Sequence, residues 1–238
     1  MIYQLDLPVD IMAHSHSDAA LSATQLAQTV ADALREAIDS HGRASLVVSG
    51  GRSPLAFFQC LSRQDLDWSR VVVGLADERW VDPRSTQSNE YLVINYLLQG
   101  RAASASFIGL YQTAESLEAA AQAAEVALEA LPQPIDVLVL GMGEDGHTAS
   151  LFPDSPNLAQ ALDPEGNRLC LPMLAPTEPR ERITLTAPLL LAARHQLLVI
   201  GGSAKVETLR RAIAGNDVRE MPIRAFLHYP LEIHWHPE

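Results

Sequence analysis

The sequence is poor in cysteine and lysine. Its 238 residues contain two cysteines, Cys60 and Cys170, with no Cys-x-x-Cys pair. This excludes a disulfide framework and a thiolate zinc site, and it favours a reducing, cytoplasmic environment. Lys205 is the only lysine, so arginine supplies almost all of the positive charge.

The chain also lacks excess positive charge and long apolar runs. Its 17 basic and 29 acidic residues give a formal charge of −12, which disfavours nucleic acid or an anionic membrane as a partner. An anionic ligand therefore needs local cations. The longest apolar candidate, "ITLTAPLLLAA", is shorter than the roughly 18 residues of a membrane helix, and the N-terminal segment lacks the basic start of a secretory signal. We expect a soluble protein with one domain over 1–238.

Strand and helix patterns alternate along the chain. Short apolar runs predict strands over 44–51, 70–80, 105–110, 135–143 and 195–202, and amphipathic segments predict helices over 20–42, 53–62, 88–100, 116–132 and 203–215. "RITLT" and "LEIHWH" are expected as extra strands in a side layer or at an edge. This alternation predicts an α/β fold, a Rossmann-like layered and mostly parallel sheet with helices on both faces.

Two predicted strands end in paired glycines before a helix. Gly50 and Gly51 precede a helix expected to be capped by Ser53, and a second pair precedes Lys205 in a first helical turn. Glycines let the backbone approach a ligand, and the N–H groups of a helix N-terminus favour phosphate. A lysine there opposes the helix dipole unless an anion lies between. Ordinary turns and a solvated lysine are the plainer alternative.

A third strand ends in Asp77, Glu78 and Arg79. A surface ion pair is the plain explanation of such a cluster. If this loop lies beside a ligand, Arg79 is the natural partner for developing negative charge, because a guanidinium donates to oxygens and stays protonated.

The stretch "GMGEDGHTASLF" follows the apolar run "IDVLVL" and begins with Gly-x-Gly-x-x-Gly. A dinucleotide fingerprint requires a long helix next, and an acid about 20 residues later that closes a second strand. Pro153 and Pro156 interrupt the helix instead, and Asp163 does not end an apolar strand. The pattern therefore does not predict a dinucleotide site.

The same stretch places His147 among glycines and small hydroxyl residues. Such residues do not pack a core, and they leave an imidazole accessible, with Glu144 or Asp145 available to orient it. The sequence does not choose between the two carboxylates. A structural histidine is the alternative to a catalytic base.

Histidine spacing gives little support for a metal centre. His147 has no His-x-x-x-His partner, and two His-x-His pairs, His14 with His16 and His234 with His236, lie near the chain ends. The second pair would share one face of a strand and suits weak metal binding at most. Solvent-facing histidines explain it more simply, so no metal site is predicted.

Four motifs in order, "SGGRSP", "ADERWV…SNEYLV", "GMGEDGHTASLFP" and "PRERITLT…IGGSAK", resemble the 6-phosphogluconolactonases of the glucosamine-6-phosphate isomerase/6-phosphogluconolactonase superfamily. The match spans nearly the whole chain, and "GEDGHTASLFP" is its most specific part. The related glucosamine-6-phosphate deaminases typically continue after the histidine with Ile-Ala-Phe-Asn-Glu. Residues 148–152 differ from that pattern, which argues against deaminase chemistry.

The resemblance implies a fold similar to the deaminase and ribose-5-phosphate isomerase group. It also implies hydrolysis of 6-phospho-D-glucono-1,5-lactone to 6-phosphogluconate, with no metal or organic cofactor. A glucosamine-6-phosphate deaminase or isomerase is the first alternative. A sugar-phosphate-sensing module is the second, although the predicted elements leave no room for a helix-turn-helix. A monomer and a small homo-oligomer both stay open.

This chemistry assigns an expected role to each candidate. His147 is the general base, oriented by Asp145 or Glu144, and Arg79 stabilises the oxyanion. Arg182 is included because it lies in the "RITLT" motif of the resembled family. The candidates for substrate and phosphate binding are Gly50, Gly51, Arg52, Ser53, Asp77, Arg182 and Lys205.

Overall fold

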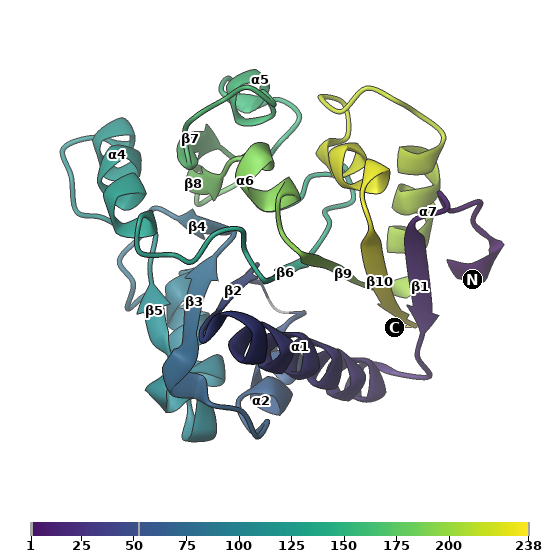
Figure 1. Cartoon of the computed structure of the whole chain (residues 1–238). Helices are drawn as coiled ribbons and strands as arrows, with labels where there is room; N and C mark the ends of the chain where they lie inside the picture. The colour runs from purple at the N-terminus through teal and green to yellow at the C-terminus, as the bar shows by residue number, and fades with distance from the viewer. Residues whose placement is uncertain (1, 52, 238) are drawn as a thin grey trace.

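The computed structural model describes residues 2–51 and 53–237, and a parallel sheet forms its centre (Figure 1). Arg52, one of the predicted phosphate ligands, lies outside the described residues. The sheet has seven strands in the order β1-β10-β9-β6-β2-β3-β5. Their bounds are β1 Ile11–Ser15, β10 Leu231–His236, β9 His195–Gly201, β6 Val137–Leu140, β2 Ala44–Val48, β3 Val71–Leu75 and β5 Ser106–Ile108. The predicted α/β fold class is confirmed.

Helices cover both faces of this sheet. The central strands β2 and β6 are buried at every position, as expected for strands with helices on both sides. Figure 1 shows α1 and α2 on one side of the sheet and α4 and α7 on the other. The bounds of the α-helices are α1 Ala19–His41, α2 Leu55–Leu61, α3 Asn89–Leu92, α4 Leu117–Leu128, α5 Leu158–Ala161, α6 Ala187–Leu191 and α7 Gly202–Ile213.

Short helical turns connect several of these elements. They are 3-10 helices at η1 Ile2–Gln4, η2 Trp68–Arg70, η4 Gly100–Ser104 and η5 Pro222–His228, and a π-helix at η3 Val93–Leu97. The π-helix continues α3 directly, so the helix predicted from Ser88 is one α-helical turn followed by wider turns. No helix among the described residues is long and apolar enough to cross a membrane.

A second sheet has three antiparallel strands, ordered β4-β8-β7, with bounds β4 Asp77–Arg79, β8 Glu181–Leu185 and β7 Cys170–Leu174. The prediction of one strand over 70–80 was wrong. Ala76 donates its N–H to Val48 O in the parallel sheet, and its carbonyl accepts from Leu185 N beside the second sheet. The chain therefore changes sheet at Ala76, and the polar cluster that follows is a strand in its own right.

The two extra strands were predicted with mixed success. "RITLT" lies in the side layer as β8, whereas "LEIHWH" forms β10 inside the main sheet, because β1 pairs in parallel along its outer side. The start of α2 also differs from the prediction. Pro54, not Ser53, occupies the N-cap position, without a side-chain cap, and the helix begins at Leu55.

The connections create a crevice between β2 and β6. From β2 the chain crosses to β3, towards one edge, while from β9 it crosses to β10, towards the other. Ligands of open parallel sheets bind beyond the carboxyl ends of the strands at such a reversal. The topology therefore places the candidate site where the glycine pairs and the His147 loop emerge.

Candidate active site

A cleft of about 650 Å³ opens beyond the carboxyl ends of β2, β6 and β9. Its walls come from residues 49–51 after β2, residues 141–143 after β6 and Gly201 at the end of β9. Of the residues predicted from sequence, it is lined by Gly50, Gly51, Ser53, Asp77, Arg79, His147, Arg182 and Lys205. Segments as far apart in the sequence as Gly50 and Lys205 therefore meet in one cavity.

Asp145 is the carboxylate that contacts His147. Its Oδ1 lies 2.6 Å from His147 Nδ1 and also accepts the backbone N–H of His147 at 3.1 Å. The backbone carbonyl of Glu144, the other candidate, accepts from the Thr208 hydroxyl and from Arg211 on α7. With Nδ1 held by Asp145, Nε2 is the ring nitrogen of His147 that can serve a ligand in the cleft.

The position of Asp145 favours its ionised form. Burial alone would raise the pKa of Asp145, but the hydrogen bond and the charge of His147 outweigh it, and the pKa lies below its ordinary value. Asp145 is therefore a carboxylate at neutral pH and fixes the tautomer of the imidazole.

Glycine is required in the loop that holds this pair. A Cβ at Gly143 would lie 2.1 Å from His147 Nδ1, and Gly146 has φ 82°, which L side chains rarely adopt. The loop closes through a hydrogen bond from Gly143 N to His147 O at 2.8 Å. The Thr148 hydroxyl adds another bond to Gly141 O. The Gly-x-Gly-x-x-Gly stretch thus builds a tight turn that presents a histidine.

Two arginines face the cleft from neighbouring strands of the second sheet. Arg79 on β4 is the register partner of Arg182 on β8. Arg79 donates to Gln87 O, while its Nε is buried without a hydrogen-bond partner in the described part of the chain. Burial lowers the pKa of Arg182, although a guanidinium stays charged at neutral pH. Both cations are therefore available to an anionic ligand.

Phe152 contacts both Arg182 and His147. The Arg182 guanidinium carbon lies 5.8 Å from the centroid of the Phe152 ring, and the His147 ring centroid lies 4.5 Å from it. The phenyl ring therefore restricts the positions of the imidazole and of the guanidinium.

The two acids before Arg79 are held in place by hydrogen bonds within the protein. Asp77 Oδ2 accepts from the Ser150 hydroxyl at 2.5 Å, which ties β4 to the His147 loop. Glu78 accepts from the backbone N–H groups of Asn89 and Glu90 at 2.7 Å each. Burial raises the pKa of Glu78 to about 7, against these donors, which lower it. The two carboxylates hold Arg79 beside the start of α3.

Sequence reasoning missed four polar residues of the cleft, two of which have unpaired buried oxygens. Ser49 Oγ and Asn89 Oδ1 are buried and have no hydrogen-bond partner among the described residues, and both residues line the cavity. Asn89 lies so close to the first glycine loop that a Cβ at Gly50 would be 1.9 Å from its Oδ1. Both stand inside the motifs "SGGRSP" and "SNEYLV", which were the available signal. Thr177 and His236 also line the cleft and were not predicted.

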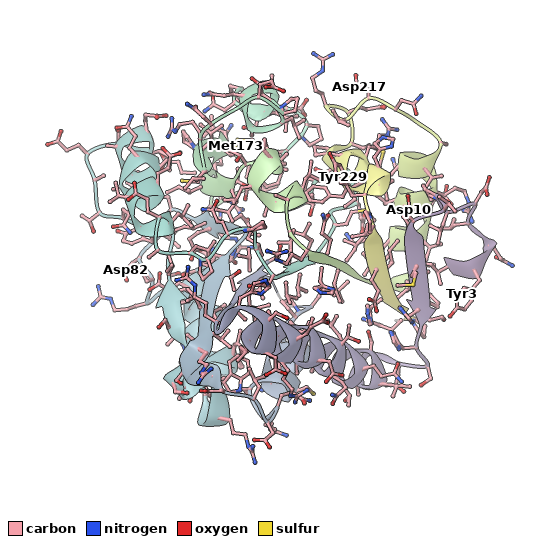
Figure 2. All side chains as sticks on the ribbon, viewed as in Figure 1. Tyr3, Asp10, Asp82, Met173, Asp217 and Tyr229 are labelled. Carbon is pink, nitrogen blue, oxygen red and sulfur yellow. The ribbon has the colours of Figure 1, made fainter. Side chains whose placement is uncertain are left out.

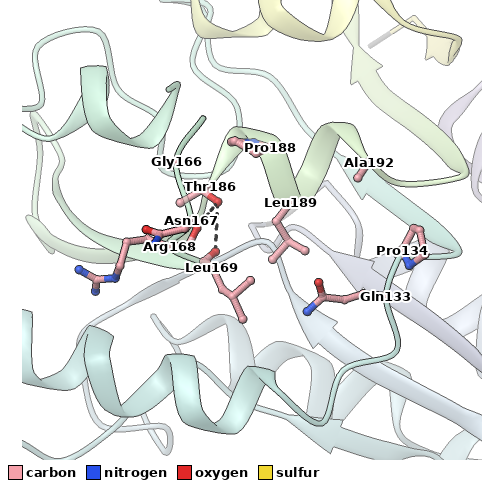
Figure 3. Close-up of a pocket in the computed structure, with 10 residues that line it drawn as sticks. All are labelled: Gln133, Pro134, Gly166, Asn167, Arg168, Leu169, Thr186, Pro188, Leu189 and Ala192. Atoms are coloured by element: carbon pink, nitrogen blue, oxygen red, sulfur yellow. Dashed lines mark hydrogen bonds between the residues drawn. The ribbon is translucent and has the colours of Figure 1, made fainter. Parts of the chain in front are cut away.

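A second hollow of about 370 Å³ lies between α6 and the loop before β7 (Figure 3). Arg168 is the charged residue among its described lining residues, and it is paired with Glu118 and Glu125. The Thr186 hydroxyl in this hollow already donates to Arg168 O. We assign no site here.

Known proteins resemble this chain over its whole length. A protein of Pseudomonas aeruginosa named 6-phosphogluconolactonase is 56% identical over 236 residues, which are 99% of each chain. The crystal structure of a 6-phosphogluconolactonase from Shewanella baltica matches with a TM-score of 0.92 at 43% identity and covers 95% of this chain and 97% of its own. A monomeric glucosamine-6-phosphate deaminase has a TM-score of 0.76 at 16% identity over 95% and 97% of the chains, which shows a shared fold alone.

A family model supports the same grouping. It describes glucosamine-6-phosphate isomerases/6-phosphogluconolactonase and matches residues 17–235, which include all four strand ends around the cleft. With 56% identity to a relative over 99% of its length, the chain belongs to this family.

Proposed function

We propose that this chain hydrolyses 6-phospho-D-glucono-1,5-lactone to 6-phospho-D-gluconate, a step of the oxidative pentose phosphate pathway. The observation that carries the proposal is the Asp145–His147 pair in a cleft that also holds Arg79 and Lys205. The relatives named 6-phosphogluconolactonase support this substrate over an amino sugar phosphate.

His147 is the proposed general base. Its Nε2 takes a proton from a water molecule as the water oxygen attacks the lactone carbonyl carbon, which gives a tetrahedral intermediate. The bond from this carbon to the ring oxygen then breaks, and His147 returns the proton to that oxygen. Asp145 stays ionised and holds Nδ1–H through the cycle. The product is an open-chain acid, which loses its proton to solvent.

Arg79 is the proposed donor to the oxyanion of the intermediate. Its Nε has no hydrogen-bond partner in the described residues, so a donor is available without breaking an existing contact. A preorganised donor of this kind contributes roughly 3–4 kcal/mol to the transition state. Asp77, held by Ser150, is proposed to accept a hydrogen bond from a sugar hydroxyl.

The phosphate is proposed to bind between the two glycine loops. Backbone N–H groups at Gly50, Gly51 and Ser53 would donate from one side, and Lys205 in the first turn of α7 from the other. Arg182 adds a further cation at the cleft. Arg52 is kept as a candidate of the same loop.

The substrate is tested with purified full-length protein at slightly acidic pH, where the spontaneous opening of the lactone is slower. We expect hydrolysis of freshly made lactone well above the uncatalysed rate, and no ammonia from glucosamine 6-phosphate. Ammonia release, with lactone opening only at the background rate, would contradict the proposal and identify a deaminase.

The proposal also covers the cellular compartment and the state of assembly of the protein. We place it in the cytoplasm as a monomer or a small homo-oligomer. Light scattering after size-exclusion chromatography measures the state of assembly.

A further inference from the structure

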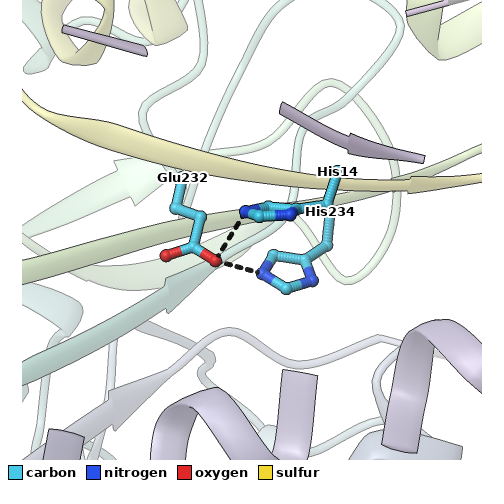
Figure 4. A group of neighbouring side chains, drawn as sticks. All are labelled: His14, Glu232 and His234. Atoms are coloured by element: carbon cyan, nitrogen blue, oxygen red, sulfur yellow. Dashed lines mark hydrogen bonds and ion pairs between the residues drawn. The ribbon is translucent and has the colours of Figure 1, made fainter. Parts of the chain in front are cut away.

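The sheet brings three metal-binding side chains together outside the cleft. β1 and β10 pair in parallel, with His14 opposite His234. Side chains two residues apart on a strand share a face, so Glu232 lies on the same side of β10 as His234. The register therefore gathers two imidazoles and a carboxylate at the edge of the sheet, as Figure 4 shows.

The distances in this cluster suit a metal ion. Glu232 Oε1 lies 3.0 Å from His14 Nε2 and 2.9 Å from His234 Nε2. Ligand atoms of a tetrahedral zinc site, with bonds of about 2.0–2.1 Å, are separated by about 3.3 Å. The two carboxylate–imidazole distances would need to lengthen by only a few tenths of an ångström, and all three ligand atoms lie within 4.8 Å of one another.

A fourth side chain orients the buried imidazole. His16 Nε2 lies 3.1 Å from His234 Nδ1, and their rings stack with centroids 5.2 Å apart. With a metal ion on Nε2, Nδ1–H of His234 would donate to His16. Metal-bound histidines almost always have such an outer partner, which fixes the ring and its tautomer.

The proposed ligands differ in how far their side chains are exposed to solvent. The His234 side chain is 2% exposed, whereas that of His14, on the edge strand, is 45% exposed. The Nε2 atom of His14 is itself buried, so the exposed His14 ring must turn outward to admit an ion, and a water can then complete the coordination from that side. Two imidazole nitrogens and one carboxylate oxygen form a ligand set typical of zinc.

We propose that His14, Glu232 and His234 form a binding site for a divalent transition metal ion of the zinc class, positioned by His16. The pair His234 and His236, considered from the sequence, is not the site, because the metal-binding atoms close to His234 come from His14 and Glu232, whereas His236 lines the cleft. The ion would join the edge strand β1 to β10, so it should stabilise the folded chain. The inference does not depend on the proposed lactone chemistry.

The test is calorimetric titration of the chelator-treated full-length protein with Zn²⁺ alone. We expect one ion per chain, and a tetrahedral visible spectrum when Co²⁺ replaces it. His14→Gln keeps the polarity of an exposed position and should weaken Zn²⁺ binding more than about 10-fold. His16→Asn should weaken it about 10–100-fold, as loss of an outer partner does.

His228→Gln, at an exposed histidine of η5, is the matched control and should leave the affinity unchanged. Zn²⁺ should also raise the Tm of the wild-type chain and of this control, but not that of His14→Gln. Equal Zn²⁺ affinity in wild type, His14→Gln and Glu232→Gln would overturn the proposal. So would the absence of stoichiometric binding to the wild-type chain.

Discussion

The carboxylate beside His147 decides how that imidazole can act. Asp145 holds Nδ1, while the carbonyl of Glu144 faces α7. Both acids precede the histidine within three residues, so spacing alone could not separate them. The backbone turn at Gly143 and Gly146 determines which carboxylate reaches the ring.

Asp145→Asn should reduce lactone hydrolysis by about 100-fold or more, since an orienting carboxylate fixes the tautomer and stabilises the imidazolium. Glu144→Gln is the matched control, with the same change of charge one residue away, and it should retain wild-type kcat. Steady-state rates of both variants, corrected for the uncatalysed reaction, provide the measurement. If Glu144→Gln loses as much activity as Asp145→Asn, our assignment of the orienting acid is wrong.

The pH profile gives an independent check on Asp145. Its pKa lies below the ordinary value, so the carboxylate is ionised throughout pH 5–8 and its contribution is lost only as the pH falls through that depressed pKa. Asp145→Asn should therefore lower kcat/KM at every pH in this range. A variant equal to wild type at pH 8 and impaired only near pH 5 would contradict this sign.

Residue types at strand ends predicted several residues that the structure brings together in one cleft. His147, Arg79 and the first glycine loop all face one cleft, although their roles stay predictions. Ser49 and Asn89 could not be found this way, because an unpaired buried oxygen is a property of the surrounding packing. The contact between Asn89 and Gly50 joins segments about 40 positions apart.

Apolar periodicity predicted the elements that lie in the centre of the sheet. It missed β1, in which Ile11 is the one fully buried residue, and β7, whose interior contains Pro172. The break at Ala76 was also unpredictable, because it depends on hydrogen bonds to Val48 and Leu185 from two different sheets. Edge strands and junctions take their structure from partners that are distant in the sequence.

Gly50→Ala tests the close contact between the first glycine loop and α3. The new Cβ would lie 1.9 Å from Asn89 Oδ1, so the Asn89 side chain must shift, which strains its hydrogen bond to Asp77 O. We expect a loss of about 1–3 kcal/mol in the free energy of unfolding, as in overpacked sites, together with a higher KM. Urea denaturation and steady-state kinetics measure the two effects.

Gly141→Ala is the matched control for this contact. Gly141 also lines the cleft, but its Cβ would meet no heavy atom within 4 Å. Its free energy of unfolding should stay within about 1 kcal/mol of wild type. Equal stability of the two variants would show that the Gly50–Asn89 contact tolerates a methyl group.

The whole molecule is acidic, yet the cleft collects cations. Acids such as Asp82 and Asp217 lie on the surface, as Figure 2 shows, and contribute to the formal charge of −12. Arg79, Arg182 and Lys205 converge on the cleft. Short-range donors can hold a phosphate dianion there, while the overall charge disfavours large polyanions.

Lys205→Ala should raise KM for the lactone about 10–100-fold with little change in kcat, as expected for one charged hydrogen bond of roughly 1.5–3 kcal/mol made equally in ground and transition states. Arg84→Ala is the control for charge, because Arg84 is exposed and paired with Asp82. Its KM should match wild type. An unchanged KM in Lys205→Ala would take this residue out of the phosphate site.

The most direct test of the account is the rate of lactone hydrolysis by His147→Ala at saturating substrate. If His147 is the base, kcat falls about 10²–10⁴-fold while the circular dichroism spectrum and KM stay close to wild type. A folded His147→Ala variant that opens the lactone at the wild-type rate, after subtraction of the spontaneous reaction, would contradict the account.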